Sequence, residues 1–284
     1  MNSVARARDF LVNQGRDIDQ VRFEYHFGNA AQEELLTVLG RYQNADGGFY
    51  GLEVDIKAPG SNPFATELAL MVCLQANVAR DHQLLQRAVQ YLEATQDEDG
   101  GWRFTPGIYE HELAPWFQGW QWPNLNPACT LAGLLKALGL GSSRLHDRVE
   151  HLFAARANVK DVATGEFYDV RPYVSYFLPE WQHPQREFYL SGVLWWLIRQ
   201  QVEGKLADAL HFFEYVRGPH TYLGQYLPAP MLAAELDQLA AEQQEDGGWP
   251  SPYDAGWRGW VTVQSLLVLQ HFGRLPARDD QPAR

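Results

Sequence analysis

An all-α fold, an α/α toroid of alternating outer and inner helices, is the architecture that this sequence predicts. The first observation is a repeat: Q-x-x-D-G-G followed by Phe or Trp occurs three times, over 43–49, 96–102 and 243–249. The second is that each copy follows an amphipathic, helix-patterned segment and precedes, after a loop, a segment that is apolar on most faces. Amphipathic helices belong outside and apolar helices inside, so we expect the two kinds to alternate.

The repeated motif has the composition of a helix stop. Paired glycines after a polar run supply the positive φ that a helix end requires, and the preceding Asp can bond backbone N–H groups of the turn. The aromatic residue can then fold back on the helix that it leaves. Gln43, Gln96 and Gln243 lie where an amide can bond a neighbouring repeat. The motif therefore indicates the fold and not the reaction.

The chain is expected to follow this plan from end to end. Outer helices are predicted at 30–43, 82–96 and 143–157 with another ending at Gln243, and inner helices at 63–76, 126–139, 186–201 and 258–272. Asn62 is placed to cap the first inner helix, and Pro63 suits its first position. We divide the chain into an N-terminal helical segment that packs on the toroid (1–29), the toroid (30–275) and a disordered tail (276–284).

Composition limits the partners. The formal net charge of −12 at pH 7 argues against nucleic acid or an anionic membrane surface. Cys73 and Cys129 fall on predicted inner helices, as expected of buried thiols and not of a disulfide framework. The sequence shows no signal peptide and no apolar run that could span a bilayer. We therefore expect a cytoplasmic protein.

Function is expected in the loops that lead from outer to inner helices. In a toroid these loops, over 50–62, 103–124, 168–183 and 250–257, gather at one mouth. The loop 103–124 is long for a compact domain and too aromatic for disorder. We predict a cavity there whose substrate-binding residues include Trp116, Trp120, Trp122, Tyr168, Tyr173, Trp181 and His111.

The candidate catalytic residues are the acids of these loops: Glu53, Asp55 and Asp169. A carboxylic acid whose pKa is raised by burial can protonate an alkene or epoxide, and aromatic rings stabilise the resulting cation. Structural roles compete: Asp55 can bond backbone N–H groups, Glu53 can pair with an Arg, and Asp169 can form an ion pair with Arg171. A His such as His183 or His111 in an aromatic loop is usually just hydrogen-bonded.

The repeat is similar to the QW-type repeat of squalene–hopene cyclases and to that of protein prenyltransferase β subunits, over about 30–274. The segments FEYHF (23–27) and LEVDIKAP (52–59) also resemble a bacterial branch labelled prenyltransferase-like or squalene-oxidase-like. The resemblance implies an α/α toroid and activity on isoprenoids. It is more specific for the fold than for any one activity.

The chain departs from those families at the catalytic motifs. The Asp-x-Asp-Asp motif of class II cyclases is absent, and Glu53-Val-Asp55 is its nearest substitute. The prenyltransferase zinc site needs an Asp two residues before a Cys, but Met71 and Pro127 occupy those positions. The Asp-rich magnesium motif of class I terpene synthases is also missing. We therefore expect no metal and no other cofactor.

Three functions remain open. The first is a terpene cyclase-like enzyme that cyclises or isomerises an apolar substrate by acid catalysis. The second is a non-catalytic toroid that binds a lipid or peptide, and the third is a glycan-processing enzyme with two facing carboxylates. Because related enzymes use two helical domains or subunits, a homodimer or a partner subunit is an expected complement.

Overall fold

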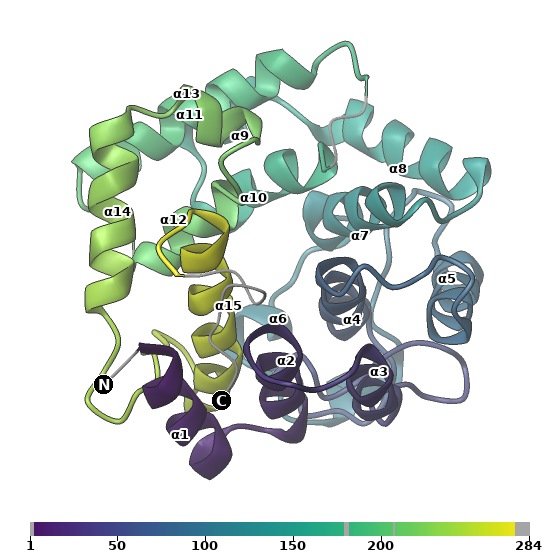
Figure 1. Cartoon of the computed structure of the whole chain (residues 1–284). Coiled ribbons are helices and arrows are strands. Elements are labelled where there is room, and N and C mark those ends of the chain that lie inside the picture. The colour runs from purple at the N-terminus through teal and green to yellow at the C-terminus, as the bar shows by residue number, and fades with distance from the viewer. Residues whose placement is uncertain (1–2, 179–181, 207, 276–284) are drawn as a thin grey trace. The chain divides into compact units, whose positions relative to one another are not determined.

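The computed structural model describes residues 3–178, 182–206 and 208–275, and every secondary-structure element of that part of the chain is a helix (Figure 1). Pairing of extended residues there is limited to isolated bridges, such as that between Ile56 and Leu113. The all-α prediction is confirmed. The chain forms two compact units, unit 1 (residues 1–38 and 194–284) and unit 2 (39–193), and we describe each by itself.

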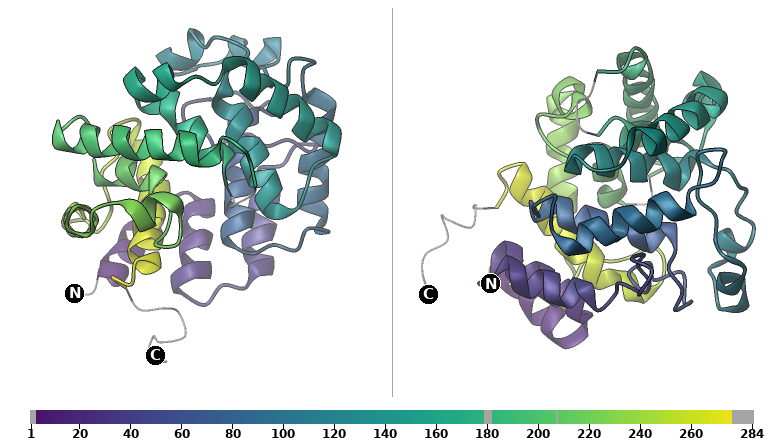
Figure 2. Two further views of the ribbon diagram at one scale, coloured as in Figure 1. Left: turned by 90° about the horizontal axis from the view of Figure 1, so that it is seen from above. Right: turned by 90° about the vertical axis from the view of Figure 1, so that its right-hand side faces the viewer.

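Unit 2 alternates buried and amphipathic helices. Its elements are α4 (Pro63–Gln75), α5 (Gln83–Thr95), η1 (Pro106–Glu110), α6 (Pro115–Gln118), α7 (Leu125–Leu138), α8 (Ser143–Arg156), α9 (Val159–Thr164) and α10 (Phe167–Tyr176). Helices α4, α7 and α10 lie side by side and are buried along most of their lengths (Figures 1 and 2). Helices α5 and α8 bury only one stripe each. The alternation predicted from the repeat is present within this unit.

Helix α10 corrects the prediction of a third loop over 168–183. Residues 167–176 are helical because Asp169 accepts a hydrogen bond from Glu166 N at 3.0 Å and so starts the helix. Gly133 of α7 lets the two backbones approach, since a Cβ there would lie 1.9 Å from the carbonyl oxygen of Ser175. The third buried helix beside α4 and α7 is therefore α10, not 186–201.

Helix α11 (Arg186–Val202) exists as predicted but is not buried as a whole. Phe188, Trp195 and Val202 are exposed, Trp195 to 72%. They recur every seventh position, which places them on one face of the helix. The apolar composition of this segment predicted a buried inner helix, but the helix is buried on one face only. Both α11 and α3 (Gln32–Gly40) cross the boundary between the two units.

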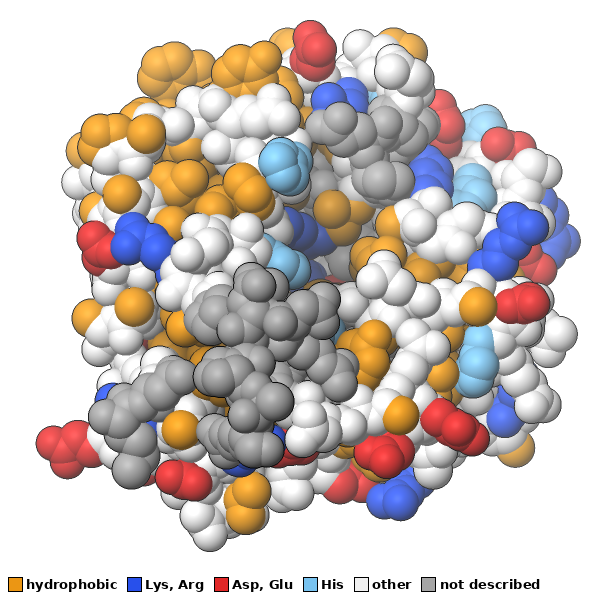
Figure 3. Space-filling view, viewed as in Figure 1, with side chains coloured by type: hydrophobic (Ala, Val, Ile, Leu, Met, Phe, Trp, Pro, Cys, Tyr) orange, Lys and Arg blue, Asp and Glu red, His pale blue; other side chains and the backbone are white. Residues whose placement is uncertain are grey.

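Unit 1 follows the same alternation. Its helices are α1 (Ser3–Gln14), α2 (Asp17–Phe27), α12 (Ala209–Tyr215), α13 (Tyr222–Tyr226), α14 (Ala229–Ala241), η2 (Ala255–Trp257) and α15 (Arg258–His271). The buried helix α15 contacts α2, α1, α12 and α14. Hydrophobic side chains gather on the side of the surface where α13 and α14 lie (Figure 3), and Tyr226 of α13 is 62% exposed.

The three repeats have the same geometry. Their glutamines each donate to two backbone carbonyls, one of their own motif and one at the start of another helix: Gln43 to Gly47 and Leu84, Gln96 to Gly100 and Leu145, Gln243 to Gly247 and Ser3. The first glycines have φ near the left-handed region, +94°, +90° and +95°. The Gln therefore ties each repeat to the next amphipathic helix, as predicted.

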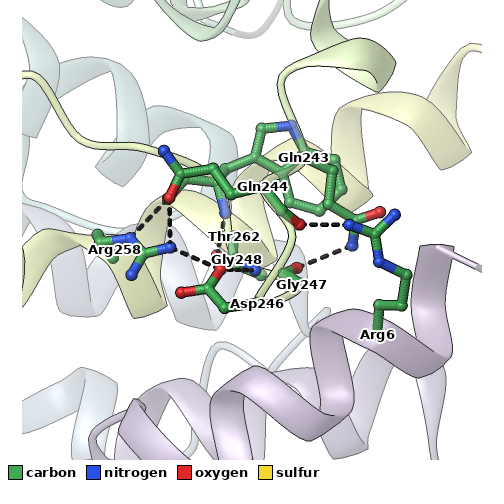
Figure 4. A network of polar contacts seen from close by, with 9 residues as sticks. Arg6, Gln243, Gln244, Asp246, Gly247, Gly248, Arg258 and Thr262 are labelled. Carbon is green, nitrogen blue, oxygen red and sulfur yellow. Dashed lines mark hydrogen bonds and ion pairs between the residues drawn. The ribbon is translucent and has the colours of Figure 1, made fainter.

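Helix α1 packs against the third repeat, some of whose polar contacts are drawn in Figure 4. The Gln243 side chain donates to the carbonyl of Ser3, and a Cβ on Gly247 would lie 2.1 Å from the carbonyl oxygen of Arg6. Arg6 in turn donates to the carbonyl of Gln244, and Arg258 pairs with Asp246 at 2.9 Å. Helix α1 thus takes the place against the third repeat that α5 and α8 take against the first two.

The motif tryptophans return to the preceding helix. Trp102 Nε1 donates to the carbonyl of Leu92 at 2.9 Å, and Trp249 Nε1 donates to that of Leu239 at 2.7 Å. Both indoles are almost fully buried, which confirms the predicted packing.

Cys73 and Cys129 are buried free thiols, also as predicted. Within the described ranges, no helix is both long and apolar enough to cross a bilayer.

Candidate active site

Two of the predicted loops meet in unit 2. Ile56 and Leu113 form an antiparallel bridge. It is extended by hydrogen bonds from Ala114 N to the carbonyl of Asp55 at 2.9 Å and from Lys57 N to the carbonyl of Glu112 at 3.0 Å. The acidic segment 53–55 is therefore joined through backbone bonds to the aromatic loop 103–124.

The aromatic loop builds a small core of its own, which we call the aromatic cluster: Phe64, Phe104, Phe117, Trp120 and Trp122. Neighbouring rings have centroids 4.8–6.4 Å apart in tilted or edge-on arrangements. Ile56 and Leu113 of the bridge belong to the same apolar core. Trp120 Nε1 is buried, and no described residue accepts its hydrogen bond.

Glu53 lies at the beginning of this segment and is only 9% exposed. Its Oε1 accepts a hydrogen bond from Asp55 N at 3.1 Å, which turns the carboxyl group back over its own loop. Asp55 itself is half-buried. Of the two candidate acids in this segment, Glu53 is therefore buried, whereas Asp55 is accessible to solvent.

A second buried acid, Glu67, lies one turn into α4, three residues after Phe64. It pairs with Arg171 of α10 at 2.8 Å, and both side chains are largely buried. Arg171 therefore pairs with Glu67, whereas the sequence suggested Asp169. The ion pair links two helices that both pack against α7.

Burial and the neighbouring charges together raise the pKa of Glu53 to about 8. The largest cause is burial, because the carboxylate would lose hydration. The negative charges of Asp55 and Glu67 also raise the pKa, while the Asp55 N–H bond and the positive charge of Arg171 lower it. Glu53 is therefore a neutral carboxylic acid at pH 7 and has a proton to give.

The other candidates lie elsewhere or in different surroundings. Trp120 and Trp122 join the aromatic cluster, but Trp116 and His111 of the same loop are exposed. Asp169 and Tyr168 are exposed at the start of α10, where Asp169 caps the helix. The cavity that these residues are expected to line stays a prediction.

Of the two remaining candidates, Tyr173 stands apart from the aromatic cluster. Tyr173 is fully buried among Phe153, Tyr189 and the backbone of Asn158, to which its hydroxyl is bonded. Trp181 lies outside the described residues. The loop 250–257 belongs to unit 1.

Sequence reasoning missed Glu67 and offered Asp169 as the ion-pair partner of Arg171 in its place. Glu67 is the only charged residue in α4, a helix that is otherwise buried and apolar. A buried charge needs a residue of opposite charge beside it, so the sequence did contain a signal. Arg171 was assigned to a loop, so its place on a buried helix was not visible. In the described parts of the chain, no group of three His, Cys, Asp or Glu side chains is arranged to hold a metal ion.

Solved structures resemble this chain in fold, at low sequence identity. A protein from Actinoplanes matches with a TM-score of 0.57 at 13% identity, over 95% of this chain and 98% of that one. The type II terpene cyclase MstE from Scytonema matches with a TM-score of 0.51 at 12% identity, over 94% of this chain and 88% of that one. No family model matches the chain, and no curated protein does.

A variant of MstE in complex with geranylgeranyl dihydroxybenzoate, described as its substrate, also matches. The TM-score is 0.52 at 13% identity, over 96% of this chain and 87% of that one. At such identities the likeness shows the fold alone. The chain therefore shares its all-helical, terpene cyclase-like fold with MstE.

Proposed function

We propose that this chain is a terpene cyclase-like enzyme that acts on an isoprenoid or similarly apolar substrate, with Glu53 as the proton donor. The observation that carries the proposal is a buried, neutral carboxylic acid in the segment that continues into the aromatic cluster. The fold shared with MstE, a cyclase with a prenylated aromatic substrate, supports it.

The charges around Glu53 affect how readily it gives up its proton. After donation the carboxylate is buried near Asp55 and Glu67, so only Arg171 and the Asp55 N–H bond favour the anion. An acid with a pKa near 8 is protonated at pH 7 but donates weakly. The better acceptor is therefore an epoxide oxygen or an activated alkene, not a plain alkene.

The aromatic cluster suits the cation that such a proton transfer creates. Ring faces attract positive charge without acting as bases, so they stabilise a carbocation without taking its proton. Trp120 Nε1 supplies one hydrogen-bond donor for a polar substituent of an otherwise apolar substrate. An isoprenoid with one polar end fits both features.

The test compares Glu53→Gln with the wild-type protein and with Asp169→Asn as a matched control. The amide introduced by Glu53→Gln keeps the shape and the neutral charge of the acid but has no proton to give, whereas Asp169 is an exposed helix cap. The proteins are incubated with farnesyl and geranylgeranyl compounds and their terminal epoxides. Products are measured by mass spectrometry, and binding by tryptophan fluorescence.

We expect Glu53→Gln to bind the substrate and lose turnover by a factor of about 10² or more, while Asp169→Asn stays active. Equal turnover by wild type and Glu53→Gln would exclude Glu53 as the acid. Binding without turnover in every protein would favour a non-catalytic, apolar-ligand-binding function. The domain boundaries, the homodimer or partner subunit and the cytoplasmic location stay predictions.

A further inference from the structure

Three side chains of unit 1 form a continuous hydrogen-bonded line. Asp208 Oδ1 lies 2.9 Å from His211 Nδ1, and His211 Nε2 lies 3.0 Å from Tyr253 Oη. The order is carboxylate, imidazole and hydroxyl, and both ring nitrogens of one histidine take part. A hydroxyl bonded to a base that a third group orients is the arrangement used in covalent catalysis.

The start of α12 holds the first two members in place. Asp208 is the N-cap residue of that helix, and its Oδ1 also accepts a hydrogen bond from His211 N at 2.9 Å. Helix α12 is buried, and His211 is only 7% exposed. The orientation of the imidazole is therefore determined by the helix start and not by a mobile side chain.

Tyr253 reaches the imidazole from the loop after the third repeat. Its backbone N–H donates to Ser251 Oγ at 3.2 Å, and the following residue, Asp254, caps η2. The phenol and imidazole rings have centroids 5.7 Å apart at 66°. Tyr253 is 40% exposed, so a reagent in solution can reach the phenol while the base behind it is covered.

The direction of the protons follows from the carboxylate. Partial burial opposes ionisation of Asp208, but the hydrogen bond and charge of His211 outweigh it, and the pKa of Asp208 stays below its ordinary value. An ionised carboxylate only accepts, so His211 Nδ1 must carry a proton. When the ring is neutral, Nε2 is an acceptor and Tyr253 Oη donates to it; when the ring is charged, Nε2 donates to Tyr253 Oη instead. The neutral ring is the reactive form, because only then does the phenolic proton point at a base, as attack by the phenol oxygen requires.

We propose that Tyr253, His211 and Asp208 form a second chemical site, which takes an acyl group from an activated ester. Tyr253 Oη attacks the carbonyl carbon while its proton passes to His211 Nε2. The bond from that carbon to the alkoxy or phenoxy oxygen breaks, and the leaving oxygen takes the proton from His211. The products are O-acyl-tyrosine and an alcohol or phenol. All three residues belong to unit 1, whereas Glu53 belongs to unit 2.

The probe is p-nitrophenyl acetate, whose release of p-nitrophenol is followed by absorbance while peptide mass spectrometry locates the acetyl group. Tyr226 is the internal control, because it is more exposed, at 62%, and no hydrogen bond of the described residues joins it to an imidazole. We expect Tyr253 to react faster than Tyr226 by a factor on the order of 10². Tyr253→Phe removes the fast phase, His211→Gln reduces it to the rate of Tyr226, and Tyr226→Phe leaves it unchanged.

The proposal is wrong if acetylation follows exposure, so that Tyr226 reacts at least as fast as Tyr253. It is also wrong if the acetyl group is found on His211, or if folded His211→Gln reacts at the wild-type rate. Circular dichroism checks the fold of each variant. Should His211→Gln not fold, Asp208→Asn replaces it: Asn can still cap α12 but lacks the negative charge that stabilises the imidazolium formed when His211 takes the phenolic proton, so the fast phase must slow.

Discussion

Arg171 on α10 donates a hydrogen bond to Glu67 on α4 at 2.8 Å, although 104 positions separate the two residues. Their helices do not follow one another in space, since α7 packs against both. The two charges lie in the largely buried part of unit 2 that also contains Glu53, and they act on its pKa with opposite signs. The ionisation of Glu53 therefore depends on two helices that are distant from each other in the sequence.

Removing one partner of the buried ion pair should cost more than removing both. Arg171→Met leaves the charge of Glu67 buried, and we expect a loss of about 3–5 kcal/mol in the free energy of unfolding. Adding Glu67→Gln removes that charge and should recover most of the loss. Urea unfolding of the two single variants and the double variant measures the coupling. A double variant as unstable as Arg171→Met alone would contradict this account of the pair.

The contribution of Glu53 to the free energy of unfolding should fall as the pH rises toward 8. The pKa of Glu53 is raised from 4.5 to about 8 in the folded state, so between these values the folded protein binds more protons than the unfolded chain. The contribution of Glu53 is fully present below pH 4.5 and is lost through about pH 8. Glu53→Gln cannot ionise, so its unfolding free energy should show a flatter dependence on pH over this window. Parallel wild-type and variant curves would contradict the raised pKa.

The first glycine of each repeat should tolerate alanine poorly because of a close approach, not only because of its φ. Gly247 has φ +95°, and a Cβ there would lie 2.1 Å from the carbonyl oxygen of Arg6. Gly139 has φ +67° with nothing within 4 Å of an added Cβ. We expect Gly139→Ala to cost about 1–2 kcal/mol for the left-handed backbone and Gly247→Ala about 3 kcal/mol or more. Thermal or urea unfolding compares the two variants. Equal losses would mean that α1 can move away from the new Cβ without a loss of stability.

The motif tryptophans should be scaffold residues. Trp102→Ala removes a buried indole and its bond to the carbonyl of Leu92, and we expect a loss of about 3–5 kcal/mol. Trp102→Phe keeps a ring but loses the bond, so its loss should be smaller. Trp116, which is 45% exposed, is the control: Trp116→Ala should stay within about 1 kcal/mol of wild type. A wild-type melting temperature for Trp102→Ala would show that the indole adds nothing to the fold.

Much of the fold could be predicted because the repeated motif acts through interactions between residues that are close in the sequence. A polar run, an Asp and two glycines stop a helix wherever they occur, so the ends of α5 and α14 were visible in the sequence. Helix α10 was not, because its aromatic and polar residues and the internal Pro172 resemble a loop. Its helical state depends on the cap at Asp169 and on packing against Gly133 of α7, which is a contact between distant segments.

The sequence by itself determined the class of fold, the helix stops and the acidic segment 53–55, because each depends on neighbours along the chain. The tertiary structure alone decided which acid keeps its proton. Glu53 keeps its proton because the fold buries it and brings the negative charge of Glu67 near it from another helix, against the opposing positive charge of Arg171. In the same way, the fold joined Tyr253 to His211, 42 positions away. Ionisation and proton direction depend on distance through space, which spacing along a chain does not encode.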